Sequence, residues 1–539
     1  MDFTNRPRRR DSKHIEAWLV GGGIASQAAA LHLIKDSKMP AGNIHILNAS
    51  TEPGGGLKTH GNAETGYFLP MDGSPHFHGE CVERLLSMIP SGKADPKKSV
   101  MDMIQERERT ESKPYKAQAR AVKQDAAGAH PLHTHGFSIG PRHRMAVINL
   151  MMESELAVKS KKIEDIFHKS FFDTSFWMLW STTFALQPWH SAAEFKRHLR
   201  KYLEDIGSLN SVKTIHRTEY NFFKSALGPL TDYLMDEGVD FRSNARVTDL
   251  QCYPDGDPTT VCAINLLQDD QEELINVDPT DIVIISLGSV NAGAVFGTNE
   301  SPPATLPSNW EEMMQGDWHL WENLAKKSLK FGNPRNFLSH IQQSTIESFT
   351  TTFTGPEFPD AYEKLTHDKP GIGSFLSFPG SSWKMTISIP HQPVFPDQPP
   401  NTTVMMGYAL NPTSTGEYTK KPMCESTGSE ILHEMLSHLG ISTEHDQIMK
   451  TAKTIPCGMP LGTAPFLTRG NHDRPAVQPE TSTNYACIGQ FVEIPADTTL
   501  EIEYSVRGAQ MAVADLMWLP DKPPKPYRSL LMEVFDLII

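Results

Sequence analysis

The stretch EAWLVGGGIASQAAALHLIKDS, Glu16–Ser37, decides the fold of this chain. A short apolar run is followed by three consecutive glycines, Gly21–Gly23, and then by an alanine- and leucine-rich segment with helical periodicity. A loop that contains Pro40 leads to the β-rich run NIHIL. This order of strand, glycine turn, helix and strand predicts the first unit of a dinucleotide-binding fold.

The glycines allow a tight turn and let backbone amides approach a pyrophosphate, whose charge the helix N-terminus favours. A purely structural turn is the alternative. A carboxylate is expected about 20 residues further on to bind the ribose, but Asn48 stands there, with Glu52 four residues later. A second glycine cluster, Gly54–Gly56, would bring more backbone close to the cofactor. The residues predicted to bind the cofactor in this unit are Gly21, Gly23, Ala25, Ser26, Asn48, Glu52, Gly55 and Gly56.

Composition narrows the class of protein. The 539 residues are too many for one core, so two or three domains are expected. A net charge of −14 argues against a nucleic-acid binder. None of the six cysteines forms a CxxC pair, so neither a metal site nor a disulfide framework is expected. Without an apolar signal region or an apolar run of about 18 residues, a reducing, cytoplasmic location is predicted.

Five further stretches of the chain, beyond the glycine turn, are informative about its family. They are ECVERLLSMIPS, FWMLWSTTFALQPWHSA, EYNFFKSALGPLTDYLMDEGVDF, IGQFVEIP and EYSVRGAQMAV. Together with VGGGIASQAAALHL, they make the chain resemble the oleate hydratases, also called myosin-cross-reactive antigens, along nearly its whole length. The resemblance implies an FAD-binding fold and a hydrophobic channel for a fatty acid. It also implies addition of water across a cis double bond, in which the flavin organises the site and the net reaction is not redox.

The predicted fold class is α/β. A Rossmann-like FAD-binding domain is split along the chain and accompanied by a mixed α/β substrate domain and a helical segment. The FAD domain is assigned to residues 15–90, 210–300 and 450–518. Residues 91–209 form the helical part of the substrate region, and residues 301–449 the substrate-binding domain. The ends are a disordered arm, 1–14, and a C-terminal helical tail, 519–539.

The residues that the resemblance makes catalytic have changed. The family's acid–base pair is a glutamate in a glycine-rich loop and a tyrosine on a helix. In GYFLPMDGSPHFHGEC, Gly66–Cys81, the glutamate falls on Ser74, whose hydroxyl is too weak an acid, and the tyrosine falls on His198. Tyr202 shares the helical face of His198. Structural or surface roles are the alternative. The predicted catalytic residues are Asp72, Ser74, His76, His198 and Tyr202.

The family's carboxylate-binding strand aligns with WKMTISIPHQPVF, Trp383–Phe395. Its three ligand positions fall on Ser388, Pro390 and Val394, and only the serine keeps a polar group. This change favours a substrate without a fatty-acid head group. Trp189 belongs to an aromatic cluster that forms either core or the wall of an apolar pocket. Trp189, Ser388, Pro390 and Val394 are therefore the predicted substrate-binding residues.

On the flavin side the family pattern is retained, which adds Ser289, Phe491, Glu493 and Ser505 to the predicted FAD-binding residues. A decayed copy would also lose its glycines and core, so we expect a working enzyme. The prediction is an FAD-dependent hydro-lyase that hydrates or isomerises a double bond of an unsaturated fatty acid or another apolar substrate. The alternatives are a cyclase, isomerase or flavin redox enzyme of small-molecule biosynthesis, and a non-catalytic flavin or lipid binder.

The predicted partners are few. The main one is the apolar small-molecule substrate. The C-terminal LLMEVFDLII is compatible with weak contact with a membrane surface, although docking of this tail on its own core is favoured. A homodimer is a further expectation that rests on the resemblance alone.

Overall fold

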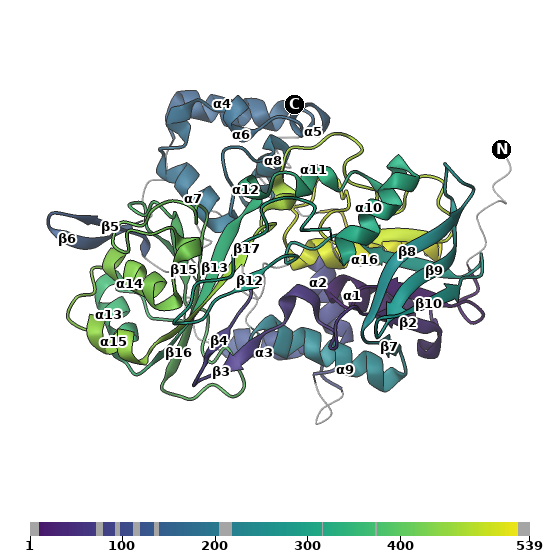
Figure 1. Ribbon diagram of the computed structural model, residues 1–539, viewed down its shortest axis with the longest axis horizontal. Helices are drawn as coiled ribbons and strands as arrows, with labels where there is room; N and C mark the ends of the chain where they lie inside the picture. The colour runs from purple at the N-terminus through teal and green to yellow at the C-terminus, as the bar shows by residue number, and fades with distance from the viewer. Residues whose placement is uncertain are drawn as a thin grey trace.

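The computed structural model describes residues 10–71, 79–91, 97–110, 119–133, 139–203, 218–314, 316–371 and 374–526. Two sheets dominate the architecture: a parallel sheet on the right of the view in Figure 1 and a larger mixed sheet on the left. Within the described residues, no helix is both long enough and apolar enough to cross a bilayer.

The parallel sheet has the order β18–β11–β1–β2–β7. Its strands are β1 (Ala17–Val20), β2 (Ile44–Leu47), β7 (Asp240–Arg242), β11 (Ile282–Ser286) and β18 (Tyr485–Ile488). All four pairings are parallel, which demands crossover connections and explains why the strands come from distant parts of the chain. The predicted α/β class with a split Rossmann-like domain is thereby confirmed.

Helices cover this sheet. They are α1 (Ile24–Lys35), α2 (Glu80–Met88), α3 (Val100–Thr110), α9 (Gly228–Glu237) and α16 (Ile502–Leu516). Every residue of α1 from Ala25 to Leu33 is buried, because the helix lies between the sheet and α16. Its small alanines permit this close approach. A three-stranded sheet of β8 (Ala245–Tyr253), β9 (Thr260–Gln268) and β10 (Gln271–Asn276) extends the domain, and α10 (Asp317–Lys327) packs on β8.

The larger sheet has eight strands in the order β12–β17–β13–β16–β15–β14–β5–β6. The strands are β5 (Ala119–Asp125), β6 (Gly128–His133), β12 (Val295–Phe296), β13 (Ile346–Thr354), β14 (Phe375–Ser377), β15 (Met385–Ser388), β16 (Thr402–Ala409) and β17 (Lys453–Met459). Four of them, β5, β6, β12 and β17, lie in segments that the sequence assigned to other parts of the molecule. The chain therefore passes between the two sheets more often than the predicted domain division has it.

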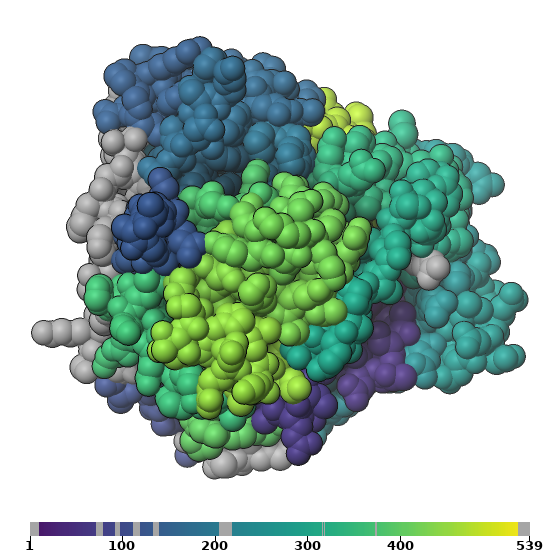
Figure 2. Space-filling view, turned by 60° about the vertical axis from the view of Figure 1, so that its left-hand side comes forward, coloured from purple at the N-terminus to yellow at the C-terminus, as the bar shows by residue number. Residues whose placement is uncertain are grey.

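One face of the eight-stranded sheet is covered by α13 (Glu357–Thr366), α14 (Gly428–His438) and α15 (His445–Thr451), which close a core that includes Phe349, Phe353 and Met435. Figure 2 shows this green helical layer on the outside of the molecule, with the dark-blue β5–β6 hairpin beside it. The other face contacts β4 (Gly66–Phe68), which pairs with β3 (His60–Asn62).

Above the large sheet lies a helical lobe (Figure 1). It consists of α4 (Pro141–Met152), α5 (Glu155–Val158), α6 (Ile163–Ile166), α7 (Ser175–Phe184) and α8 (Ala192–Tyr202). Its aromatic residues form their own core around Trp180 and Phe171, so most of the tryptophan and phenylalanine cluster predicted as core or pocket wall is core. Two short helices, α11 (Arg335–Leu338) and α12 (Ile341–Ser344), lie beside the lobe.

The predicted ends of the chain lie partly outside the described residues. Of the arm 1–14, residues 10–14 are described, and Nη1 of Arg10 donates a hydrogen bond of 2.8 Å to the carbonyl of Thr280. The arm is thus attached to the parallel-sheet domain at this point. Of the tail 519–539, residues 519–526 are described and contain no helix, contrary to the prediction for that part.

Candidate active site and cofactor cavity

A cavity of about 120 Å³ opens at the carboxyl ends of β1, β11 and β18, where doubly wound folds bind their ligands. Five predicted cofactor residues line it, namely Gly23, Ala25, Gly56, Ser289 and Ser505. They come from segments separated by several hundred residues. The fold therefore gathers at one sheet edge the two halves of the site that the sequence predicted separately.

Close backbone packing shapes the rim of this cavity. Gly21 adopts φ +102°, a conformation that favours glycine. A Cβ atom added to Gly22 would lie 2.4 Å from Oδ1 of Asn48, and one added to Gly55 would lie 3.1 Å from Cα of Gly23. The two glycine clusters thus touch each other through their main chains, which only residues without side chains permit.

The start of α1 is suited to an anion. Its N-cap is Gly23, and no side-chain hydrogen bond caps the helix. The backbone amides of its first turn therefore point toward the cavity without a capping oxygen, and the helix dipole favours negative charge there. The donor set fits the pyrophosphate of a dinucleotide.

The other five predicted residues of the N-terminal unit do not line the cavity; they are Gly21, Ser26, Asn48, Glu52 and Gly55. Ser26 is buried and its hydroxyl donates to the carbonyl of Val20 over 3.3 Å. Asn48 is also buried, and its Nδ2 donates to the carbonyl of Ser50 over 2.7 Å. The amide at the expected ribose-binding position is therefore used locally. Glu52 is exposed to solvent.

The two predicted cofactor residues Phe491 and Glu493, from the C-terminal part of the chain, are also absent from the cavity lining. Phe491 is fully buried below Gly288, where a Cβ atom would lie 2.9 Å from its ring. Glu493 accepts hydrogen bonds from Arg197 at 2.5 Å and from Arg469 at 3.1 Å. Burial by itself would raise the pKa of Glu493, but these two guanidinium groups keep that pKa well below its ordinary value. Its observed contacts are those of a structural ion cluster.

The predicted catalytic residues divide into two groups. Asp72, Ser74 and His76 lie outside the described residues. His198 and Tyr202 lie on α8, and both are buried, so the surface placement weighed for them is wrong. His198 Nδ1 is 2.8 Å from the carbonyl of Glu194 in its own helix. Burial lowers the pKa of His198, which keeps the ring neutral near pH 7.

Tyr202 belongs to a buried polar network that reaches the cavity through Glu501. Its hydroxyl donates to Oε1 of Glu501 over 2.7 Å, and Lys201 Nζ lies 2.5 Å from the other carboxylate oxygen. Thr498 also donates to Oε1. Glu501 itself lines the glycine cavity. The network therefore connects α8 of the helical lobe with the cofactor cavity.

The charges in this network are well defined. Burial, and after it Glu501, raises the pKa of Tyr202 well above its ordinary value, so the phenol stays protonated. Burial alone would lower the pKa of Lys201, but Glu501 and Asp497 raise it, so the ammonium stays charged. A protonated phenol and a carboxylate in direct hydrogen bond are suited to proton transfer.

Sequence reasoning missed Glu501. Its only local signal is the spacing Thr498-x-x-Glu501 immediately before α16, and that spacing usually indicates helix capping. Its partners on α8 are some 300 residues away, at sequence separations of 299 for Tyr202 and 300 for Lys201. No pattern in the sequence brings them together.

The predicted substrate-binding residues lie on or beside the large sheet. Ser388 ends β15 and is buried, as are Pro390 and Val394. The carbonyl of Val394 accepts from the backbone amide of Asn221 over 2.8 Å. Trp189 donates its indole N–H to the carbonyl of Gln343 over 2.9 Å, so its polar edge is used by the protein.

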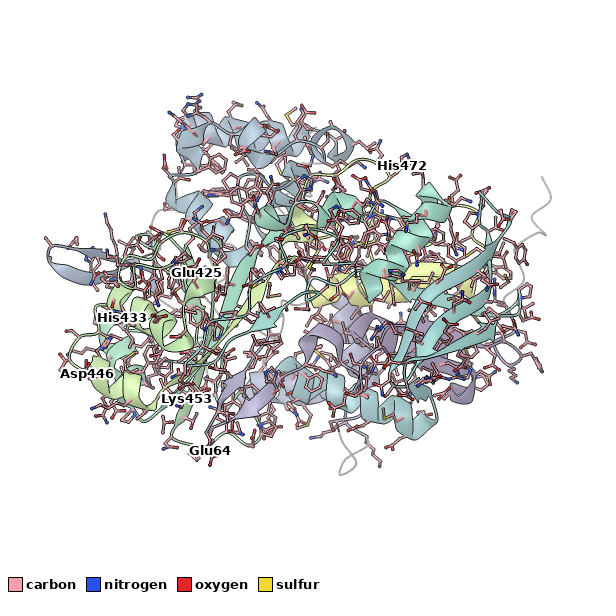
Figure 3. All side chains as sticks on the ribbon, viewed as in Figure 1. Glu64, Glu425, His433, Asp446, Lys453 and His472 are labelled. Atoms are coloured by element: carbon pink, nitrogen blue, oxygen red, sulfur yellow. The ribbon has the colours of Figure 1, made fainter. Side chains whose placement is uncertain are left out.

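Another cluster resembles a catalytic array but lies elsewhere. His433 Nδ1 is 2.9 Å from His445 Nε2, and His445 Nδ1 is 3.3 Å from Asp446. His433 and Asp446 lie on the outer helices, away from the cofactor cavity (Figure 3). Because the Asp446 side chain is 94% exposed, this chain of groups is a surface arrangement.

Comparison with known proteins agrees with this architecture. The sequence profile described as the MCRA family matches residues 14–514. An oleate hydratase of Streptococcus pyogenes serotype M49 (strain NZ131) is 30% identical over 94% of this chain and 86% of its own length. A linoleate hydratase of Lactiplantibacillus plantarum is 27% identical over 97% of this chain and 98% of its own length.

Solved structures share the fold at low identity. A putrescine oxidase bound to putrescine superposes with a TM-score of 0.52 at 10% identity, covering 94% of this chain and 99% of its own. Cyclohexylamine oxidase from Brevibacterium oxydans IH-35A superposes with a TM-score of 0.52 at 12% identity, covering 94% of this chain and 99% of its own. These likenesses concern the fold alone.

Proposed function

The chain belongs to the MCRA family, and from this premise we propose that it is an FAD-dependent hydratase that adds water across a double bond of an unsaturated fatty acid. The relatives named oleate hydratase and linoleate hydratase support the reaction class. The observation that carries the proposal is the hydrogen bond from Tyr202 to Glu501, whose carboxylate belongs to a residue that lines the glycine cavity.

FAD is proposed as the cofactor because the glycine rim and the uncapped start of α1 fit a dinucleotide pyrophosphate. Gly23, Gly56 and Ser505 would contact it. When bound, FAD would supply an ordered ring system beside the substrate, and hydration requires no net transfer of electrons.

Hydration of an isolated alkene needs a proton donor at one carbon and a base that activates water at the other. We assign the first role to Tyr202 and the second to Glu501. The phenol gives its proton to one alkene carbon while water adds to the other carbon and loses a proton to the Glu501 carboxylate. That proton returns to the phenolate through the 2.7 Å hydrogen bond, so the residues are regenerated.

Lys201 has a supporting role in this scheme. Its ammonium lies 2.5 Å from Glu501 and would hold the carboxylate in place for its role as base. His198 is neutral and bound to its own helix, and its ring contacts Phe184 at a centroid distance of 4.8 Å. We therefore assign His198 to positioning of the aromatic wall rather than to proton transfer.

The test is a product analysis. The purified protein, loaded with FAD and reduced, is incubated with oleic acid and with linoleic acid, and the products are analysed by mass spectrometry. A hydroxy acid heavier than the substrate by one water is the expected result. An isomer of unchanged mass, or unchanged fatty acids with the flavin still bound, would contradict the proposal.

A further inference from the structure

Arg120 occupies an irregular position on β5. In the antiparallel pairing with β6, Ala119 faces His133 and Ala121 faces Leu132, so Arg120 is an extra residue in the strand. Such a bulge redirects the side chain of the inserted residue. Ala119 and Val122 both pack in the core under the helical layer. Regular alternation would place Arg120 beside Val122, but the bulge turns it to the opposite face.

On that face Arg120 contacts the helical lobe and the neighbouring strands. Its Nη2 donates to Oγ1 of Thr183 on α7 at the long distance of 3.4 Å. Tyr408 on β16 lies close enough to affect its charge, and its hydroxyl donates to the carbonyl of Thr182. The guanidinium therefore lies between the large sheet and the C-terminal end of α7.

The charge of Arg120 has no counterpart among the described residues. The residue is 3% exposed, its Nε has no hydrogen-bond partner, and no described carboxylate lies within 4.0 Å. Burial lowers the pKa of Arg120 to about 10. The other deeply buried arginines of this structure are paired with carboxylates; they are Arg197, Arg469, Arg474 and Arg507.

A buried guanidinium without a counter-ion is costly unless an anion joins it. The surroundings of Arg120 suit the end of an anionic ligand, because buried hydroxyl groups line the same face of the sheet. Across the strands, Tyr408 is opposite Thr386, Thr386 is opposite Ser377, and Ser377 is opposite Ala121. Ser377 and Thr386 are linked by a hydrogen bond of 3.2 Å.

The row of hydroxyl groups formed by Tyr408, Thr386 and Ser377 lies next to a predicted substrate-binding residue on β15. Ser388 is two residues beyond Thr386 on β15 and so lies on the same face. Thr183 is followed by Phe184, whose ring stacks on Tyr202 at a centroid distance of 4.9 Å. The end of α7 thus joins the Arg120 region to the proposed proton-transfer pair.

We propose that Arg120 binds the carboxylate of the fatty acid and so replaces the head-group ligands lost at Pro390 and Val394. This inference rests on the proposed function. The guanidinium would form a two-point, charge-assisted hydrogen bond with the carboxylate. The acyl chain would extend along Phe184 toward Tyr202. The expectation of a substrate without a fatty-acid head group is thereby replaced by one with the head group bound from a different strand.

The test compares ligands that cannot react. Binding of stearic acid and of stearyl alcohol to the FAD-loaded protein is measured by calorimetry for the wild type and for the R120M, R120K and K123M variants. Lys123 is an exposed cation on the same strand and serves as the matched control. Circular dichroism and bound flavin show that each variant is folded.

We expect the wild type and K123M to bind the acid more tightly than the alcohol. R120M should lose affinity for the acid by about tenfold or more, while its affinity for the alcohol changes little. The affinity of R120K for the acid should lie between those of the wild type and R120M, because lysine keeps the positive charge but lacks the planar guanidinium group.

Equal binding of the acid by folded R120M or R120K and by the wild type would overturn the assignment of Arg120 and leave the hydratase proposal standing. The same holds if the wild type binds the acid and the alcohol equally well. Failure of the wild type to bind either ligand would instead reject the fatty acid as substrate, and with it both proposals.

Discussion

Single side chains carry the proposed chemistry, and Tyr202 is the one most directly tested. Replacement by phenylalanine removes only the hydroxyl that donates to Glu501. We predict that Tyr202→Phe lowers kcat for oleic acid hydration by about 100-fold or more, since a positioned acid typically contributes that much. Glu501→Gln should show a comparable loss, with flavin content unchanged in both.

Tyr233→Phe on α9 is the matched control, because this tyrosine accepts a hydrogen bond from Lys35 outside the network. Its turnover should equal that of the wild type. Full activity of Tyr202→Phe would show that the proton donor lies elsewhere, and the loop residues Asp72 and His76 would then be the next candidates.

Glu347 on β13 is a buried carboxyl group outside the proposed site. Neither of its oxygens has a hydrogen-bond partner among the described residues, and burial raises its pKa from 4.5 to about 8. In the unfolded chain the group ionises near pH 4.5, whereas in the folded protein it stays protonated up to about pH 8. The free energy of unfolding should therefore fall by about 1.4 kcal/mol per pH unit across this window.

Glu347→Gln removes this titration while it keeps the size of the side chain. We predict that the variant is more stable than the wild type at pH 7.5 and that this advantage shrinks toward pH 4.5. Urea unfolding at several pH values measures the difference. A stability difference that is independent of pH would show that Glu347 is not the titrating group.

At the scale of elements, the contact between the glycine turn and the end of β2 is a steric requirement. A Cβ atom on Gly22 would lie 2.4 Å from Oδ1 of Asn48. We predict that Gly22→Ala reduces the amount of bound flavin and destabilises the domain by about 1–3 kcal/mol, the usual cost of overpacking. Flavin absorbance and thermal unfolding measure the two effects.

Two further variants distinguish a steric clash at Gly22 from a general effect of replacing glycine by alanine. Gly42→Ala should be neutral, because no atom lies within 4 Å of the added Cβ. Asn48→Ala should restore part of the stability lost in Gly22→Ala, since the two residues are in contact and their effects should couple. Simple additivity of the two substitutions would contradict the steric explanation.

At the scale of the whole molecule, a buried ion cluster joins the helical lobe to the C-terminal part of the parallel-sheet domain. Arg197 and Glu194 come from α8, whereas Arg469 follows β17 and Glu493 follows β18. Removal of one partner leaves buried charge uncompensated. Glu493→Gln should lower the free energy of unfolding by about 3 kcal/mol, with a smaller effect on flavin affinity.

Glu480→Gln, an exposed glutamate of the same segment, is the control for this substitution. Thermal unfolding and flavin titration of both variants distinguish the two roles of Glu493. If Glu493→Gln lost flavin but kept its stability, the cofactor role expected from the family resemblance would be correct and the structural role assigned here would be wrong.

Local patterns in the sequence determined the parallel-sheet domain. The apolar strand, the glycine turn and the alanine-rich helix of Glu16–Ser37 are consecutive residues, and their conformations follow from short-range sterics and hydrogen bonding. The family was also identifiable from contiguous motifs. For the same reason Gly23, Gly56 and Ser505 were predicted beside the cavity that they line.

Only the tertiary structure decided which polar groups meet. Tyr202 was a sequence candidate, but its partner Glu501 is 299 residues away and carries a signal typical of helix capping. A bulge in β5 turns the Arg120 side chain toward the helical lobe. Its proposed role as an anion ligand depends on the absence of a neighbouring carboxylate among the described residues. Glu493, predicted as a cofactor residue, lies among buried arginines. These outcomes depend on long-range packing and on desolvation, which periodicity and spacing do not contain.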